Sequence, residues 1–160
     1  MSSVVLQIPL NHIVAYTTFT NSGYAVDNID TTYADTANVG SLTANGVGTL
    51  PAGTISKVRI GIRGYHGGAN YQYIKAYFNG TLGTRHDTSM GNSDTGTIEW
   101  FDVTSDGAGP GADNWTWNII STLGVYGEFS ATSKSHFLIN QLYVEVTYEP
   151  IIKPNFFPFF

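Results

Sequence analysis

The chain has 160 residues, enough for one domain with its own core, and it has no cysteine, which excludes disulfides, thiolate nucleophiles and cysteine-based zinc sites. Charged residues make up only 12% of the sequence and the net charge is −5, whereas a nucleic-acid partner requires a basic surface. We therefore expect no nucleic-acid partner and a surface whose polarity comes from Thr, Ser, Asn, Gly and Tyr.

The N-terminal segment 1–10 is expected to be an apolar arm or strand, in which Val4, Leu6 and Ile8 form one row. It has no basic n-region, and its apolar run is too short for a secretory signal. No stretch of the chain approaches the ~20 apolar residues that a membrane helix requires. We expect no membrane span and see no signal peptide in the sequence as given, although a signal removed beforehand would leave the same start.

A period of two dominates residues 11–150, which predicts an all-β domain: a single antiparallel β-sandwich of the jelly-roll-like type, with extended apolar arms at both ends. Clusters of Gly, Asn, Asp and Pro separate the strands. The clearest alternation predicts six core residues: Val58, Ile60, Ile62, Leu142, Val144 and Val146.

The remaining rows predict which side chains face solvent. Lys57, Arg59 and Arg63 alternate with the core residues and should form a solvated cationic row that folding does not need. Leu138 falls in the same row as Leu142 and should face the core. The segment 114–123 is the one stretch that favours a helix, of one or two turns.

The last eleven residues, 150–160, combine four Phe and two Ile with three Pro, and proline prevents a regular helix or central strand. Each exposed Phe forgoes roughly 1.5–3 kcal/mol of burial, so another surface should cover this segment. We interpret 151–160 as an assembly tail. The predicted assembly interface consists of Val4, Leu6, Ile8, Ile151, Ile152, Phe156, Phe157, Phe159 and Phe160.

No pattern in the chain predicts catalysis. The four histidines, His12, His66, His86 and His136, lack the spacing of a local metal motif. His86 lies within Arg85-His86-Asp87, which we interpret as a polar turn before a strand. Glu99, Asp102 and Glu128 are carboxylates of the kind that glycosidases use, but such residues occur by chance in any β-protein. We predict no catalytic residues and no enzyme.

Aspartates in two loops raise the question of a metal. Asp27, Asp30 and Asp35 lie in one loop, and Asp106 and Asp113 flank a glycine-rich one. Carboxylates and carbonyls suit Ca²⁺, but Asp is also an ordinary turn residue. The expectation is no cofactor, and a structural Ca²⁺ held by Asp27, Asp30 and Asp35 is the alternative.

Exposed aromatic residues are candidates for contact with a glycan or a partner protein. They are Tyr71, Tyr73, Tyr77, Trp100, Trp115 and Trp117. Aromatic rings stack on sugars and also dominate protein interfaces. The alternative is that the tryptophans close the ends of the sandwich and the tyrosines face a neighbouring subunit.

Three segments in order carry a resemblance: 28–35 with its D-x-x-Y-A turn, 50–63 with its Leu50-Pro-Ala-Gly-Thr-Ile strand start, and the W-T-W turn of 115–125 followed by the final strand 140–148. This order resembles the β-sandwich modules of tailed-phage structural proteins and microbial surface proteins. The resemblance covers most of 15–148 and implies the sandwich architecture. Family members serve as decoration proteins, fibres and adhesins.

Together these features predict a non-enzymatic structural protein of a virus particle, as a capsid decoration, minor capsid or tail component. The alternatives are a subunit of an extracellular filament or pilus that uses donor-strand exchange, and a carbohydrate-binding, lectin-like module. The expected partners are further copies of the chain, other virion or filament proteins, and surface glycans. The expected location is a virion or an extracellular assembly.

Overall fold

The alternating segments of the sequence form two antiparallel sheets. The computed structural model describes residues 2–29, 31–36, 40–67, 69–93, 95–111, 113–131 and 136–151. Sheet A contains β1 (Val4–Pro9), β3 (Ala34–Thr36), β5 (Gly53–His66), β9 (Glu99–Asp102) and β11 (Phe137–Pro150). Sheet B contains β2 (His12–Thr17), β4 (Gly40–Asn45), β6 (Ala69–Phe78), β7 (Thr81–Leu82), β8 (His86–Asp87) and β10 (Leu123–Ala131). Two short helices, η1 (Ser22–Val26) and α1 (Trp117–Thr122), complete the described elements.

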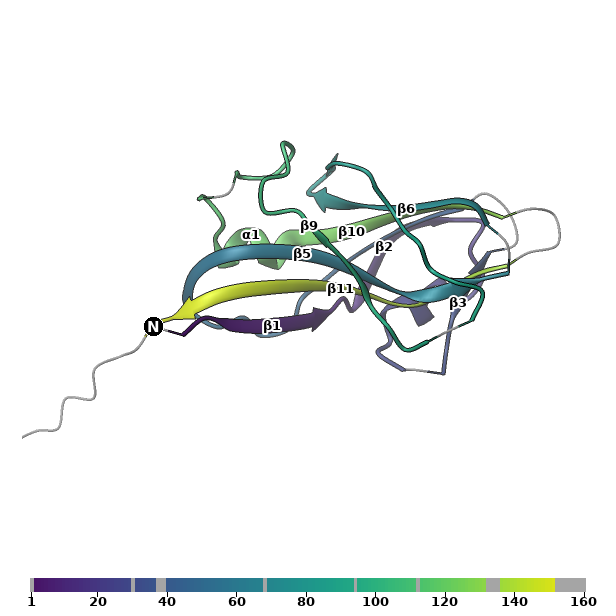
Figure 1. The fold of residues 1–160 in the computed structure, drawn as a ribbon, viewed down its shortest axis with the longest axis horizontal. Coiled ribbons are helices and arrows are strands. Elements are labelled where there is room, and N and C mark those ends of the chain that lie inside the picture. Colours follow the sequence, from purple (N-terminus) through teal and green to yellow (C-terminus); the bar gives the residue numbers. More distant parts are fainter. Residues whose placement is uncertain are drawn as a thin grey trace, which may run out of the picture.

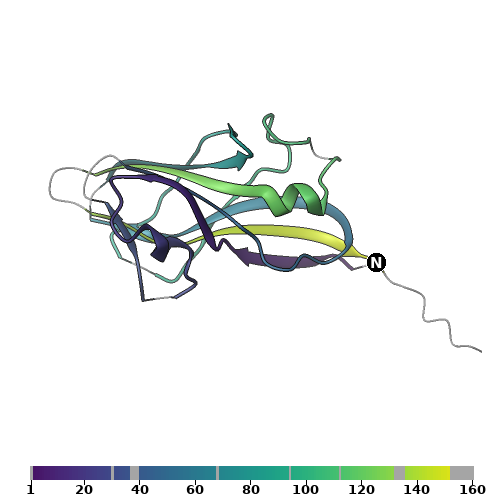
Figure 2. The ribbon, with the colours of Figure 1, turned by 180° about the vertical axis from the view of Figure 1, so that it is seen from behind.

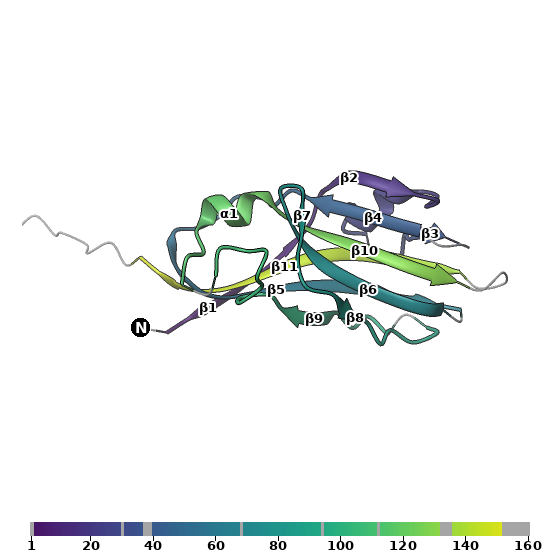
Figure 3. The ribbon, with the colours of Figure 1, turned by 90° about the horizontal axis from the view of Figure 1, so that it is seen from above.

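The two sheets pack face to face, which confirms the predicted antiparallel β-sandwich (Figures 1 and 3). The strand order is β1-β11-β5-β9 in sheet A, with β3 also on β11, and β2-β4-β10-β6-β7 in sheet B, with β8 on β6. Consecutive long strands repeatedly change sheet, as in a jelly-roll-like sandwich. Because β1 pairs with β11, the first and last described strands are neighbours (Figure 2).

The core lies between β5 and β11 on one side and β6 and β10 on the other. All six core residues predicted from β5 and β11 are fully buried, which confirms the assigned alternation. Sheet B contributes Ile74, Leu123, Val125 and Phe129, which are also fully buried. Phe129 stacks on Phe137 of β11 with ring centroids 4.0 Å apart, so this aromatic pair joins the two sheets.

A β-bulge in β11 makes one predicted core position wrong. The alternation puts Leu138 in one row with Leu142, but the pairing with β5 shifts register between Ile139 and Gln141. An extra residue reverses the order in which side chains face the two sides of a strand. Phe137 and Ile139 are therefore fully buried, whereas Leu138 is only partly buried.

The bulge region also buries two polar side chains, and both hold neighbouring loops. Gln141 donates from Nε2 to the carbonyl of Leu10 (2.8 Å) and accepts from the backbone N–H of Asn28 (2.9 Å). Asn140 donates from Nδ2 to two carbonyls of the 29–32 loop (3.0 and 3.1 Å). Because a buried amide is costly unless it is hydrogen-bonded, these contacts fix the chain on both sides of η1.

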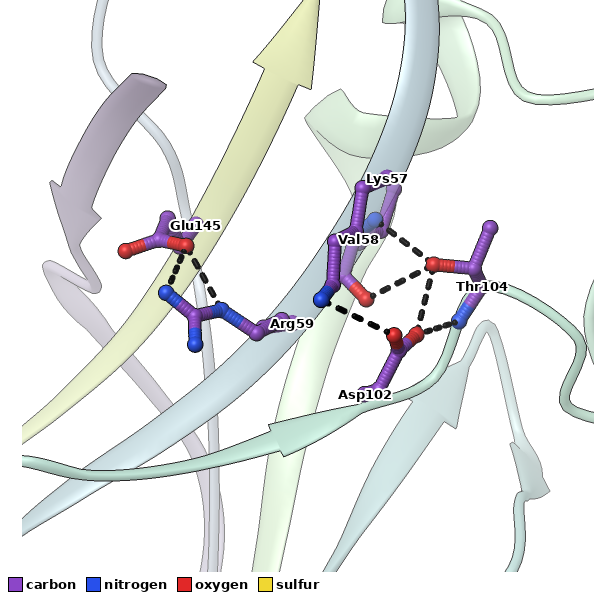
Figure 4. Close-up of polar contacts among 6 residues, drawn as sticks. All are labelled: Lys57, Val58, Arg59, Asp102, Thr104 and Glu145. Carbon is purple, nitrogen blue, oxygen red and sulfur yellow. Dashed lines mark hydrogen bonds and ion pairs between the residues drawn. The ribbon is translucent and has the colours of Figure 1, made fainter.

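On the outer face of sheet A, Arg59 does not behave as the sequence alternation predicts. Its Nε donates to the Glu145 carboxylate at 2.6 Å, and its guanidinium also forms an ion pair with that carboxylate (Figure 4). Gln7 of β1 donates to the other carboxylate oxygen at 3.0 Å. Glu145 is only 2% exposed, so Arg59 compensates a buried charge. The expectation that Arg59 belongs to a solvated row is wrong.

Thr104 anchors the end of β9 to β5. Its hydroxyl donates to Asp102 (2.6 Å) and accepts from the backbone N–H of Val58 (2.9 Å), as Figure 4 shows. Burial alone would raise the pKa of Asp102, but the hydrogen bonds from Thr104 and the Lys57 ammonium 3.3 Å away lower it. Lys57 remains about half exposed, in agreement with the predicted solvated row.

The assignment of Ile60 to the core predicts that Ile60→Ala causes a large loss of stability. This change removes buried methyl and methylene groups from the centre of sheet A and should lower the free energy of unfolding by about 2–5 kcal/mol, measured by urea denaturation. The matched control is Ile151→Ala, at a side chain that is 67% exposed, with an expected effect within about 0.5 kcal/mol. Similar values for the two variants would contradict the assigned interior.

The Arg59–Glu145 pair gives a second stability prediction. Arg59→Met leaves a buried carboxylate without its cation and should lower the free energy of unfolding by about 2–4 kcal/mol. This loss is smaller than that for breaking a fully buried ion pair, because Arg59 is partly exposed. Lys57→Met, the matched control, should cost about 0–1 kcal/mol. Adding Glu145→Gln to Arg59→Met should restore part of the loss, because it removes the unpaired charge. An Arg59→Met effect as small as that of Lys57→Met would refute the role given to Arg59.

Candidate functional site

The first candidate surface is the end of sheet A at which both ends of the described chain lie. Val4 of β1 pairs with Tyr148 of β11, so the N-terminal strand begins beside the point where β11 ends (Figures 1 and 2). Three apolar side chains are exposed there: Val4 at 40%, Val5 at 56% and Ile151 at 67%. We call these three residues the terminal patch. Exposed apolar residues gathered at a strand edge are a feature of interaction sites.

The predicted assembly residues of β1 differ in their surroundings. Val4 is exposed, Leu6 is partly buried against the core, and Ile8 is buried at 7% exposure. β1 is thus the edge strand of its own sheet, and no strand among the described residues pairs with its outer side. The other predicted assembly residues, Ile152, Phe156, Phe157, Phe159 and Phe160, lie outside the described residues.

The second candidate surface is the outer face of sheet B, where β6 and β10 carry a tyrosine cluster. Tyr71, Tyr73 and Tyr77 occupy alternate positions of β6, as the sequence predicts. Glu128 of β10, directly opposite Tyr73, accepts hydrogen bonds from the hydroxyls of Tyr126 (2.6 Å) and Tyr71 (3.3 Å). One carboxylate therefore organises the phenols around it.

The charge of Glu128 and the burial of its neighbours shift pKa values in opposite directions. Hydrogen bonds from Tyr126 and Tyr73 lower the pKa of Glu128, so it remains ionised. Burial, reinforced by the adjacent Glu128 charge, raises the pKa of Tyr73 to about 12. The same two causes raise the pKa of Tyr126. The cluster thus contains an anionic carboxylate beside the phenols of Tyr73 and Tyr126, which remain neutral at physiological pH.

Arg85 covers part of this cluster. Its guanidinium lies 4.2 Å from the centroid of the Tyr73 ring and 5.9 Å from that of Tyr71, and the Lys75 ammonium lies 5.5 Å from the Tyr73 ring. Tyr73 is consequently only 8% exposed, whereas Tyr71 is 37% exposed. Cation–π contacts within the chain occupy the Tyr73 ring, whereas Tyr71 is exposed and Tyr77 is partly exposed.

Two of the three predicted tryptophans serve the fold. Trp115 is buried, packs on Phe78 and donates from Nε1 to the carbonyl of Thr104 at 2.9 Å. Trp117 begins α1, lies edge-on to Tyr148 at 5.0 Å and donates to the carbonyl of Gly53 at 2.9 Å. These contacts support the alternative interpretation, in which the tryptophans close an end of the sandwich.

Trp100 lies elsewhere, beside a groove of about 430 Å³. We call it the Trp100 groove, because Trp100 and Glu99 of β9 line it together with seven described residues of the preceding loop: Ser89, Met90, Gly91, Ser93, Thr95, Thr97 and Ile98. The Trp100 ring rests on β5 at Gly61, where an added Cβ would come within 2.6 Å of two ring atoms. The Arg59 guanidinium lies 5.4 Å from its centroid and the Tyr143 ring 5.9 Å. The indole is therefore held in one orientation.

The calcium candidates are engaged in other contacts. Asp27 accepts from the N–H of Ile29 (2.9 Å) and the hydroxyl of Thr32 (2.7 Å), as in an Asx turn. Asp35 pairs with His136 at 2.9 Å, and Asp30 lies outside the described residues. Within the described ranges, no group of three or more His, Asp or Glu residues is arranged to hold a metal ion.

The carboxylates weighed as glycosidase candidates lie on different elements. Glu128 belongs to sheet B, whereas Glu99 and Asp102 belong to β9 of sheet A. His86 stacks on Phe101 at 5.2 Å, burial lowers its pKa, and its neighbours Arg85 and Asp87 form an ion pair at the surface. The interpretation of Arg85-His86-Asp87 as a polar turn before a strand is wrong in its boundary, because His86 and Asp87 themselves form the short strand β8.

The sequence reasoning missed the polar lining of the Trp100 groove. Its signal is the segment 89–97, which is rich in Ser, Thr and Gly and is separated by one residue from Glu99 and Trp100. Such a run has no periodicity and resembles an ordinary loop. Only the folded structure brings this loop beside Glu99 and Trp100, which line the same groove.

Comparison with protein-family models finds no family that matches the chain, and comparison with curated proteins finds no significantly similar sequence. The resemblance to phage and surface-protein modules therefore stays a prediction beyond the shared architecture. Among the described residues, no helix is both long and apolar enough to cross a bilayer.

The contacts of Glu128 predict a specific acid sensitivity. Its folded-state pKa lies below the ordinary value of 4.5, so the contacts of the ionised form stabilise the fold fully above pH 4.5, and this stability is lost as the pH falls through the lowered pKa. Urea denaturation between about pH 6 and pH 3 should show a shallower loss of stability for Glu128→Gln than for the wild type. The matched control, Glu149→Gln, replaces an exposed glutamate and should keep the wild-type slope. A wild-type slope in Glu128→Gln would contradict the assignment.

Proposed function

We propose that the chain is a non-enzymatic structural module that assembles into a larger particle through the end of sheet A carrying the terminal patch. The observation that supports this most directly is the pairing of Val4 with Tyr148, which brings both ends of the described chain to one place. Val4, Val5 and Ile151 are exposed at that end, which supports a contact surface there. A component of a virus particle is the first choice.

The backbone chemistry of β1 suits this role. The outer edge of β1 has no strand partner in the part of the chain that the structure describes, and such an edge offers N–H and C=O groups to an added strand. The Phe-rich segment 152–160 continues directly from Ile151 in the sequence. An apolar segment beside an open edge can anchor one copy on another through a few aromatic residues.

A filament subunit that uses donor-strand exchange receives less support. In that mode an incoming strand completes an incomplete sheet, whereas β1 already completes sheet A in its own chain. Ile8 is 7% exposed, so withdrawal of β1 would uncover part of the core. Contact through the terminal patch and residues 152–160 leaves the sandwich intact.

The test compares association among variants of the full chain by analytical ultracentrifugation. Val5→Lys places a charge in the terminal patch and should weaken association about tenfold or more. Val14→Lys is the matched control, because Val14 is also an exposed valine, at 42%, on an edge strand, but in sheet B. Deletion of 152–160 should leave a folded domain and weaken association at least as much as Val5→Lys.

Two outcomes would refute the proposal. One is unfolding of the chain that lacks 152–160, which would show that this segment belongs to its own core. The other is equal association of the Val5→Lys and Val14→Lys variants and the unmodified chain. Negative-stain microscopy of the same samples distinguishes a closed particle from a filament.

A further inference from the structure

We propose that the Trp100 groove binds a neutral sugar, as one pyranose unit of a glycan. This activity is separate from assembly, because the groove lies at β9, on the opposite edge of sheet A from β1. Its volume of about 430 Å³ falls within the range of about 300–1,000 Å³ that is typical of small-ligand sites.

The groove wall is fixed from the interior of the sandwich. Gln72 of β6 is 8% exposed and donates from Nε2 to the carbonyls of Thr88 (3.3 Å) and Met90 (3.2 Å). The carbonyl of Gly91 accepts from the N–H of His66 at 3.0 Å. These bonds tie the 88–91 segment to strands of both sheets, so this wall is formed before a ligand arrives, which lowers the entropic cost of binding.

Glu99 provides a fixed acceptor in the groove. Its two carboxylate oxygens accept from the backbone N–H of Ser89 (3.0 and 2.9 Å), and one also accepts from the Ser89 hydroxyl (2.8 Å). A carboxylate has about four lone-pair sites, so Glu99 retains capacity to accept from the hydroxyls of a ligand. The hydrogen bonds from Ser89 fix the orientation of the Glu99 carboxylate before a ligand binds.

The remaining lining defines the ligand class. The side chains of Ser93, Thr95 and Thr97 can each donate and accept a hydrogen bond, and Trp100 supplies an aromatic surface held by Gly61 and Arg59. This combination matches a ring that carries hydroxyls around apolar C–H groups. No Lys or Arg is among the described residues that line the groove, the Arg59 guanidinium beside Trp100 is already paired with Glu145, and Glu99 repels anions, so the sugar is neutral.

The test uses four neutral probes and one charged probe with the full chain. The neutral probes are the methyl glycosides of glucose, galactose and mannose, together with N-acetylglucosamine, and glucuronic acid is the charged probe. Binding is followed by the indole N–H shifts in ¹H–¹⁵N NMR, which Trp100→Phe and Trp117→Phe assign. At least one neutral sugar should shift the Trp100 signal with a dissociation constant of about 1–10 mM, and glucuronic acid should bind more weakly.

Three variants locate the site. Ser93→Tyr, at an exposed loop position, should fill the groove and abolish binding without touching the core. Glu99→Gln should weaken binding of the neutral sugar and remove the discrimination against glucuronic acid. Trp117→Phe, the matched control at the end of the sandwich, should bind as the wild type does.

The proposal is overturned if no neutral probe shifts the Trp100 signal up to about 50 mM. Undiminished binding in Ser93→Tyr would overturn it as well, because the sugar would then lie elsewhere. Tighter binding of glucuronic acid than of every neutral probe would refute the inferred ligand class.

Discussion

The pairing of β11 with β1 on one side and β5 on the other is the constraint on which the structure depends. These three strands form most of sheet A, and the inward side chains of β5 and β11 are the centre of the core. Because β1 and β11 are antiparallel, the start of one lies beside the end of the other. The position of both ends of the described chain at one end of sheet A therefore follows directly from the strand pairing.

The outer face of sheet A shows how this pairing also places polar residues. Gln7, Glu145 and Arg59 come from β1, β11 and β5 and meet in one cross-strand row, so a carboxylate is buried without being left unpaired. One row further along, Tyr143 and Gly61 accompany Trp100. The polar row stabilises the sheet, and the aromatic row supports one side of the Trp100 groove. The proposed assembly surface and the Trp100 groove therefore lie at opposite edges of the same sheet.

Local periodicity was sufficient to predict the sandwich and most of its interior. The rows of β5 and of the second half of β11 alternate regularly, and the six core residues that the sequence predicts from them are fully buried. Leu138 was misplaced because a bulge changes the phase of β11, and no local pattern marks it. The role of Arg59 was missed because its partner Glu145 lies 86 positions away in the sequence and is recognisable only from the register.

The candidate sites were only partly predictable, because they too depend on contacts between residues that lie far apart in the sequence. The tyrosine row of β6 follows from alternation, but its cover by Arg85 depends on how β8 pairs with β6. Trp100 was identified as a candidate from its residue type alone. The loop that completes its groove has no periodicity, and its position depends on hydrogen bonds to Gln72 and His66 that join distant segments.

The central functional claim is that the edge formed by β1 is where copies of the chain meet. Hydrogen–deuterium exchange of the full chain, measured in a dilute monomeric sample and in an associated one, tests it most directly. The account predicts that amides of β1 gain protection on association, while amides of β2, the edge strand of sheet B, exchange at the same rate in both samples. New protection confined to β2, or unchanged exchange in β1 when the protein is associated, would contradict it.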